Sequence, residues 1–364
     1  MGILLAIVLF SVIIIIHEFG HFLFAKLNGI EVFEFSLGMG PKLVSKQIGK
    51  TLYCIKLLPL GGSCMMGEDE LEEKPSEESI VGDNAEDSID AGVERRIGNF
   101  NEKSVGARMS VIVGGPLFNF LLAWICAVVM VIWVGVDTAE IGAVVEESPA
   151  QEAGLQAGDE ITEMNGRNVH LFREILAYNQ FNPGKTVTVE YSRDGEKNEV
   201  VIEPVVNEET GGYFMGISAS PYEKTNVIES LQYGVYTVRY WIYTVLDSLK
   251  MMVTGHVSMN DIAGPVGIVN VVDDTYQQSA KVGWDMVVLN LLNLTVLLSA
   301  NLGVMNLLPF PALDGGRLVF LILEAIRGKR ISPEREGMFH FIGFAALMVL
   351  MVVVLFNDVL RIFQ

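Results

Sequence analysis

Long apolar stretches separated by polar segments dominate this chain. Crossing the roughly 30 Å hydrocarbon core of a bilayer takes about 20 apolar residues in a helix. Four stretches are predominantly apolar over about that length: 3–27, 109–136, 286–308 and 339–356. The first follows no basic residue and has no small-residue cleavage site, so we interpret it as a retained helix rather than a signal peptide. We therefore expect a membrane protein with a four-span α-helical bundle.

The segment between the second and third stretches has the pattern of a small folded module. Short β-type runs alternate with turn dipeptides such as Asn165-Gly166, and two helical patterns lie between them. The runs are 141–145, 186–191 and 199–202, and the helical patterns cover 149–155 and 171–178. An amphipathic stretch over 227–253 then predicts a helix lying against the membrane surface or the bundle.

Residues 31–66 predict an inner, membrane-associated β-hairpin. Alternating apolar positions indicate short strands, with 38–41 and 59–62 as turns between them. Strands at membrane depth must pair within protein or line a water-filled cavity, so this hairpin is a candidate to line one. The following stretch, 68–94, is acidic and poor in apolar residues, which predicts a solvated insertion.

Composition and charge exclude several classes of protein. Hydrophobic residues make up 51% and charged residues 19% of the 364 residues, which excludes a disordered chain and a purely cytosolic enzyme. The net charge of −19 gives no basic face for nucleic acid. Lysine and arginine gather in the links between the first two and the last two stretches. This bias places both links in the cytoplasm, and both termini with 137–285 outside.

The strongest chemical signal is His17-Glu18-Phe19-Gly20-His21 at the end of the first apolar stretch. Histidines four residues apart project from one face of a helix, where both imidazoles can bind one metal ion. Glu18 is close enough to move a proton of the attacking water. A helix-end cluster reaching the interface is the simpler alternative, but each charged group within a span costs about 2.5–3.5 kcal/mol on insertion scales. The motif therefore indicates a zinc site.

Two histidines leave a catalytic zinc ion one protein ligand short. Asp314 follows a Pro-broken turn that interrupts an apolar stretch, and such a turn can aim a carboxylate into the bundle. Capping of the helix over 315–326 is another possible role for Asp314. His340 lies near the same face and stays open as a ligand, whereas His170 and His256 fall in the outer segment.

Together these motifs resemble the site-2 protease family of intramembrane zinc metalloproteases, in particular the bacterial regulator of sigma-E protease type. The matching features are the histidine motif, the Asn306–Gly315 segment, Pro59-Leu60-Gly61-Gly62 and Gly114-Gly115-Pro116. The resemblance covers nearly the whole chain. It implies one zinc ion held by His17, His21 and Asp314, with Glu18 as catalytic acid/base.

The resemblance also implies how a substrate binds. Asn301 and Asn306, with Gly61 and Gly62 of the hairpin, would hold an unwound transmembrane segment of a single-span protein, such as an anti-sigma factor or a remnant signal peptide. The outer module resembles a PDZ domain, in which Met215, Gly216 and Ile217 would bind the C-terminus of a peptide. Only one such domain fits here, where the sigma-E regulator type carries two. The acidic insertion is likewise not typical of the family.

Two other functions fit parts of the pattern. A non-catalytic membrane adaptor would use only the PDZ-like domain, and a transporter would need polar residues along several spans. The presence of every catalytic element together favours the protease. The expected organisation runs as follows: first span 1–30, hairpin region 31–67, acidic insertion 68–104, second span 105–136, PDZ-like domain 137–222, interfacial segment 223–284, third span with turn and helix 285–328, and loop with fourth span 329–364.

Overall fold

The computed structural model describes residues 2–66, 99–207, 211–255 and 264–362. The chain divides into two compact units, each assembled from separate stretches of sequence. The first contains Met1–Ala6, Asn119–Met305 and Leu347–Gln364, and the second contains Ile7–Phe118 and Asn306–Ala346. Residues 68–98 of the predicted acidic insertion, and His256, lie outside the described residues. The rest of the predicted insertion, 99–104, contains the short 3-10 helix η1 (Phe100–Glu102), in which Phe100 is buried.

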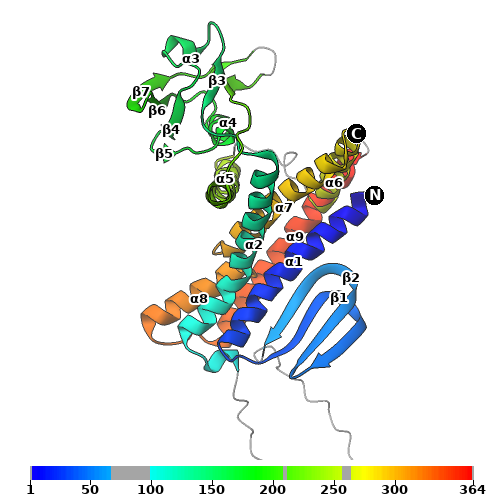
Figure 1. Ribbon diagram of the computed structural model, residues 1–364. Helices are drawn as coiled ribbons and strands as arrows, with labels where there is room; N and C mark the ends of the chain where they lie inside the picture. Colours follow the sequence, from blue (N-terminus) through cyan, green and yellow to red (C-terminus); the bar gives the residue numbers. More distant parts are fainter. Residues whose placement is uncertain (1, 67–98, 208–210, 256–263, 363–364) are drawn as a thin grey trace, which may run out of the picture. The chain divides into compact units, whose positions relative to one another are not determined.

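Each of the four apolar stretches forms a long helix. Within the described residues, these four helices are the ones long and apolar enough to cross a bilayer. They are α1 (Gly2–Leu27), α2 (Val105–Val134), α7 (Trp284–Leu307) and α9 (Pro333–Ile362), shown in Figure 1. At 1.5 Å per residue, even the 24 residues of α7 extend about 36 Å, which exceeds the apolar thickness of a bilayer.

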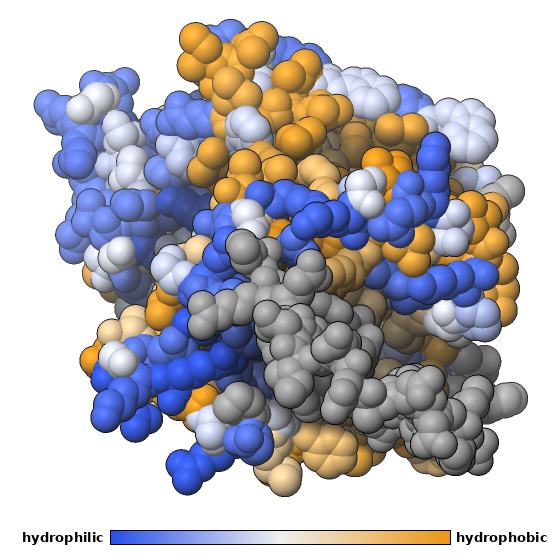
Figure 2. All heavy atoms as spheres, turned by 90° about the horizontal axis from the view of Figure 1, so that it is seen from below, coloured by the Kyte–Doolittle hydropathy of each residue, from blue (hydrophilic) through white to orange (hydrophobic). Residues whose placement is uncertain are grey.

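These helices expose many apolar side chains. In α9 only 6% of the most apolar window is buried, and Phe341, Ile342, Val349 and Val352 are all at least 60% exposed. Figure 2 shows apolar side chains gathered in broad areas on one face of the molecule. Exposed apolar patches of this kind mark a binding surface, and on helices of this length the matching environment is lipid.

In the second unit, strands β1 (Val32–Ile48) and β2 (Thr51–Met66) form an antiparallel pair beside α1 (Figure 1). Residues 34–37 have partners at both ends of β2, in 52–55 and in 62–65. The first part of β1 is therefore the centre of this small sheet. Residues 62–66 pair with β1 along one edge, and no second partner strand is recorded for them among the residues described.

The chain turns back at the two predicted turn segments, 38–41 and 59–62. Residues 34–37 run in the same direction as 52–55 and opposite to 62–65, whereas 44–48 run opposite to 51–55. Both segments lie inside the strands, which continue to Ile48 and Met66. Glycines at positive φ, such as Gly38 at 86° and Gly61 at 84°, let the backbone bend within a strand. The pairing between β1 and β2 is correspondingly irregular.

Helix α8 (Asp314–Arg327) completes the second unit and starts at the predicted ligand. Arg108 of α2, only 4% exposed, donates to both carboxylate oxygens of Glu324 on α8, at 3.1 and 2.5 Å. Leu321 of α8 packs in a core with Ala25, Ile30 and Val111. This core and ion pair join α8 to the C-terminal end of α1 and the N-terminal part of α2.

The first unit contains the predicted outer module. A four-stranded sheet has the order β5-β4-β6-β7, and the strands β10-β3 and β8-β9 form two further pairs. Its core is apolar and includes Ile141, Ile161, Met164, Ile175 and Val189. The elements are β3 (Ile141–Val144), α3 (Pro149–Glu152), β4 (Glu160–Met164), β5 (Arg167–Asn168), α4 (Phe172–Phe181), β6 (Val187–Arg193), β7 (Glu196–Ile202), β8 (Val205–Val206), β9 (Tyr213–Phe214) and β10 (Ile217–Ala219).

The helix predicted over 227–253 is confirmed as α5 (Val227–Val253), and the expected interfacial segment 223–284 also contains α6 (Pro265–Ala280). Helix α5 packs against α2, where the indole N–H of Trp124 donates to the Leu231 carbonyl at 3.1 Å. The α6 N-terminus is closed by Asp358, whose carboxylate accepts three backbone N–H groups at 3.0–3.1 Å. The sequence pattern missed this cap because its two halves are about ninety residues apart.

Candidate metal centre

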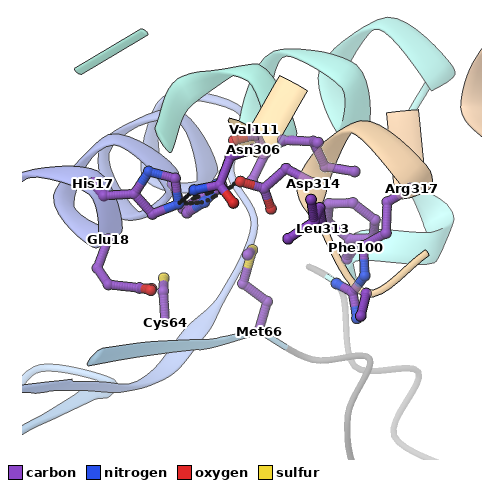
Figure 3. A pocket seen from close by; sticks show the side chains of 13 residues that line it. His17, Glu18, Cys64, Met66, Phe100, Val111, Asn306, Leu313, Asp314 and Arg317 are labelled. Atoms are coloured by element: carbon purple, nitrogen blue, oxygen red, sulfur yellow. Dashed lines mark hydrogen bonds and ion pairs between the residues drawn. The ribbon is translucent and has the colours of Figure 1, made fainter. Parts of the chain in front are cut away.

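Helix α1 places His17 and His21 on one face, as their spacing predicts. Both residues are 8% exposed, and their rings meet edge to face with centroids 4.8 Å apart. Their Nε2 atoms are 3.2 Å apart. The two imidazole nitrogens therefore point to a common position, and Figure 3 shows the His17 ring directed toward Asn306 and Asp314.

Asp314 joins them from the first turn of α8. Its Oδ2 lies 3.3 Å from Nε2 of His17 and 3.4 Å from Nε2 of His21. The helix begins after Leu313, which makes no side-chain cap, so Asp314 is the first helical residue and not the cap that its sequence also allowed. Its carboxylate points at the histidines instead (Figure 3).

The turn before Asp314 needs its small residues. A Cβ on Gly315 would lie 2.1 Å from the Leu308 carbonyl oxygen, and one on Gly316 would lie 2.3 Å from that of Phe310. Helix α8 therefore folds back onto its own preceding turn only because both positions are glycine. Sequence reasoning identified the Pro-Gly pattern, and the structure shows the close approach that it permits.

The donor atoms of this group fit a zinc ion. Nδ1 of His21 lies 2.8 Å from the Val111 carbonyl oxygen, which can only accept, so Nδ1 carries the proton and Nε2 presents a lone pair. Asp314 Oδ2 is buried, and no hydrogen-bond donor reaches it in the described chain. A tetrahedral zinc ion with bonds of about 2.0–2.1 Å separates its ligand atoms by roughly 3.3 Å, which is the spacing found here.

Two further residues contact the histidines. Asn306, at the end of α7, places Nδ2 3.5 Å from Nε2 of His17. Gly115 of α2 lies so close that an added Cβ would be 2.3 Å from Nε2 of His21 and 2.7 Å from Cε1 of His17. A side chain at position 115 would occupy the space beside the donor atoms.

Glu18 lies in the same cavity, which has a volume of about 200 Å³. Its carboxylate hydrogen-bonds with the backbone of Cys64 in the last part of β2 (Figure 3). Gly62 of β2 packs on its stem, because a Cβ there would lie 2.8 Å from Cγ of Glu18. Gly61 precedes it at positive φ. The edge of the small sheet thus forms one wall of the cavity and orients Glu18.

His340 does not belong to the group of converging ligand atoms found among the described residues. Its Nδ1 accepts the backbone N–H of Ala312 at 2.9 Å, and Ala312 has a positive φ of 71°. Gly343, one turn further along α9, packs on Pro311, since a Cβ there would lie 2.1 Å from Cβ of Pro311. His340 therefore contacts the turn that carries Asp314.

The Val111 carbonyl has no sequence signature, because it acts through its backbone, which any residue supplies. Gly115 belongs to the Gly114-Gly115-Pro116 motif, and the structure shows that it acts through the absence of a side chain. Arg317, which also lines the cavity, had a visible signal as a charged residue just after the Asp-Gly-Gly turn. The sequence interpretation did not use it.

The remaining predicted residues lie in the first unit. Asn301 is half-buried on α7. Met215, Gly216 and Ile217 line a separate cavity of about 490 Å³, bounded also by Asn179 of α4. The carbonyls of Met215 and Gly216 accept from Ala150 and Val145 at 2.9 and 2.8 Å, so this segment is firmly paired within the module.

Comparison with known proteins identifies the family. Residues 5–350 match the model of peptidase family M50. The chain belongs to this family, the site-2 proteases, and is a membrane-bound zinc metalloendopeptidase that acts as an intramembrane protease.

Relatives match along almost their whole length. A protein of Shouchella clausii named zinc metalloprotease RasP is 35% identical over 423 aligned positions, covering 98% of each chain. The regulator of sigma-W protease RasP of Bacillus subtilis is 34% identical over 423 positions, again covering 98% of each.

Among solved structures, the PDZ domain of an SdrC-like protein of Listeria monocytogenes matches 24% of this chain and 90% of its own. The identity is 26% and the TM-score is 0.21. Because the TM-score is this low, the comparison does not establish the fold of the outer module. Its fold is described from its own strands and helices.

Proposed function

We propose that this protease holds one zinc ion per chain through His17, His21 and Asp314, and that Glu18 is its catalytic acid/base. The observation that carries the proposal is the convergence of two imidazole nitrogens and a carboxylate oxygen, 3.2–3.4 Å apart, in a cavity that also contains Glu18. Three protein ligands leave a fourth position open, as catalytic zinc sites require.

The chain's own groups account for the proton transfers. When bound, zinc polarises the scissile carbonyl and lowers the pKa of water to about 7. The Glu18 carboxylate takes a proton from the attacking water and delivers it to the leaving amine nitrogen. The hydrogen bond with the Cys64 backbone holds that carboxylate in place. The bond from His21 Nδ1–H to Val111 fixes the orientation of the imidazole.

The substrate is a transmembrane segment of a single-span protein. Its helical carbonyls are hydrogen-bonded, so it must unwind before a peptide bond is exposed, and backbone groups within a membrane must then find new partners. Residues 62–66 of β2 offer a strand edge beside Glu18, which supports addition of the unwound segment as a further strand. The amides of Asn306 and Asn301 supply further hydrogen bonds.

Anti-sigma factors and remnant signal peptides are the substrate classes that we favour. One of the relatives, that of Bacillus subtilis, is named a regulator of sigma-W protease. In this proposal a membrane-bound anti-sigma factor, already shortened outside the membrane, reaches the cavity as an unwound segment.

The proposed topology has four spans, with the outer module and both termini extracytoplasmic. The four long apolar helices and the distribution of lysine and arginine support it. Residues 137–222 are proposed to form a PDZ-like domain in which Met215, Gly216 and Ile217 bind the C-terminus of a peptide. The cavity beside these three residues supports that role.

The test uses purified protein in detergent with a labelled transmembrane peptide. Glu18→Gln should keep one zinc ion per chain and lose cleavage, whereas Asp314→Asn should lose zinc as well. Asp285→Asn is the matched control, because Asp285 also occupies the first turn of a helix but lies outside the cavity. Full cleavage by the Glu18 variant would refute the mechanism, and unchanged zinc in the Asp314 variant would refute the ligand set.

The same assay separates the alternatives. A non-catalytic adaptor predicts that the peptide stays intact with or without a zinc chelator. The protease predicts cleavage that the chelator abolishes and added zinc restores. The family assignment and the complete set of catalytic groups favour the second outcome.

A further inference from the structure

Arg317 lies one turn after Asp314 on α8 and lines the same cavity. Its side chain is exposed and extends away from the histidine–aspartate cluster, on the side of Phe100 (Figure 3). Among the residues lining the cavity, Arg317 is the one with a permanent positive charge. A guanidinium here is within reach of a peptide bound across the zinc ligands.

The helix dipole disfavours a positive charge at the position of Arg317. Arg317 lies near the N-terminus of α8, where the helix dipole is positive and cations are disfavoured by about 0.3–1 kcal/mol. Among the described residues, the guanidinium of Arg317 makes no hydrogen bond or ion pair, and only its backbone N–H donates, to the Leu313 carbonyl at 3.4 Å. Five other arginines each pair with a carboxylate, although several are much more buried; they are Arg108, Arg167, Arg173, Arg193 and Arg239.

We infer that Arg317 is a subsite that binds a carboxylate of the peptide substrate; this inference rests on the proposed function. A guanidinium presents paired N–H donors that match a carboxylate. Asp314 and Arg317 are about 4.5 Å apart along the helix axis, and an extended peptide advances about 3.3 Å per residue. Allowing for the length of the arginine side chain, the carboxylate belongs within about three residues of the scissile bond.

That carboxylate has two possible sources. It is either an acidic side chain of the substrate or the α-carboxylate that hydrolysis creates on the N-terminal product. The first would give Arg317 a role in substrate preference, and the second a role in product release. Both use the same guanidinium–carboxylate contact, so one set of variants can distinguish them.

The first experiment compares transmembrane peptides that carry Glu or Gln at each of three positions on either side of the cleavage site. At one position, Arg317→Gln should raise KM for the Glu peptide about 10- to 100-fold and leave the Gln peptide unchanged. Arg327→Gln, an exposed arginine at the end of the same helix, is the control and should change neither. Zinc content should stay at the wild-type level in both variants.

The second experiment measures binding of the N-terminal product, as free acid or as amide, to Glu18→Gln protein. Tighter binding of the acid that disappears when Arg317→Gln is added assigns the subsite to the α-carboxylate. The inference is overturned if Arg317→Gln weakens Glu and Gln peptides equally, or if neither carboxylate is preferred by protein with Arg317 intact. Binding needs no turnover, so failure of the proposed protease activity would appear separately, as intact peptide in the first experiment.

Discussion

The Gly115→Ala substitution tests the metal centre directly, because it adds one methyl group beside the two histidines and changes no charge or hydrogen-bonding group. The added Cβ would lie 2.3 Å from Nε2 of His21 and 2.7 Å from Cε1 of both His17 and His21. Ordinary contacts at such atoms are about 3.4 Å or longer, so the imidazoles or α2 must move by about 1 Å. Zinc–ligand distances tolerate only about 0.2 Å. The variant should therefore bind zinc at least 10- to 100-fold more weakly, by analogy with second-shell changes.

The substitution separates the site from the stability of the helix. Alanine favours a helix interior over glycine by roughly 0.5–1 kcal/mol, so helix propensity alone predicts a more stable α2. Gly106→Ala is the matched control on the same helix, because no atom lies within 4 Å of its added Cβ. It should keep zinc and full activity.

The assay measures zinc per chain after dialysis against graded chelator, followed by cleavage of the labelled peptide. Misplacement by about 1 Å can cost on the order of 100-fold in rate, so Gly115→Ala should lose at least that much activity. Wild-type zinc affinity and cleavage in the Gly115 variant would refute the close contact and, with it, the arrangement of the two histidines.

Three further perturbations test the supports of the site. His340→Leu removes the acceptor for the Ala312 N–H and should lower zinc affinity about tenfold, whereas His340→Gln should recover part of it through its amide oxygen. Arg108→Met leaves the Glu324 carboxylate unpaired and should destabilise the protein by about 2–4 kcal/mol in thermal unfolding, partly reversed by Glu324→Leu. Burial would raise the pKa of Glu34, but hydrogen bonds from two lysines outweigh it and lower the pKa to about 2. The lowered pKa stabilises the folded protein by about 1–2 kcal/mol after solvent screening, and this contribution is present above pH 4.5 and lost toward pH 2. Amide hydrogen exchange in β1 should therefore become faster as the pH falls through this range. The Glu34→Gln variant should not show this pH dependence.

The features that were predictable from the sequence are local ones. The four long helices follow from unbroken apolar stretches, and the histidine pair follows from a spacing of four residues on one of them. Each feature depends on residues within one element, where backbone geometry alone fixes which side chains share a face. The Pro-broken turn before Asp314 could also be predicted, because proline fixes the backbone φ angle and glycine permits conformations that other residues avoid.

The hairpin shows where such reasoning stops. Its glycines and prolines correctly indicated where the chain turns back, but they did not indicate that residues 34–37 pair with both ends of β2. Which residues pair depends on the packing of the sheet beside α1, and strand pairing across distant residues leaves no local pattern. The motif containing Gly115 was visible in the sequence, but its close approach to His17 and His21 became evident only in the structure.

The three proposed ligands differ in what holds them. His17 and His21 keep their spacing as long as α1 is helical, since both belong to one rigid element. Asp314 reaches them only because α8 packs on α2 through Arg108 and because α9 contacts the preceding turn at Ala312. Strain at Ala312, with its positive φ, would otherwise favour another conformation of that turn. Changes in α8 or α9 therefore affect the metal centre through Asp314, so the carboxylate is the ligand at which zinc affinity and the packing of the unit are coupled.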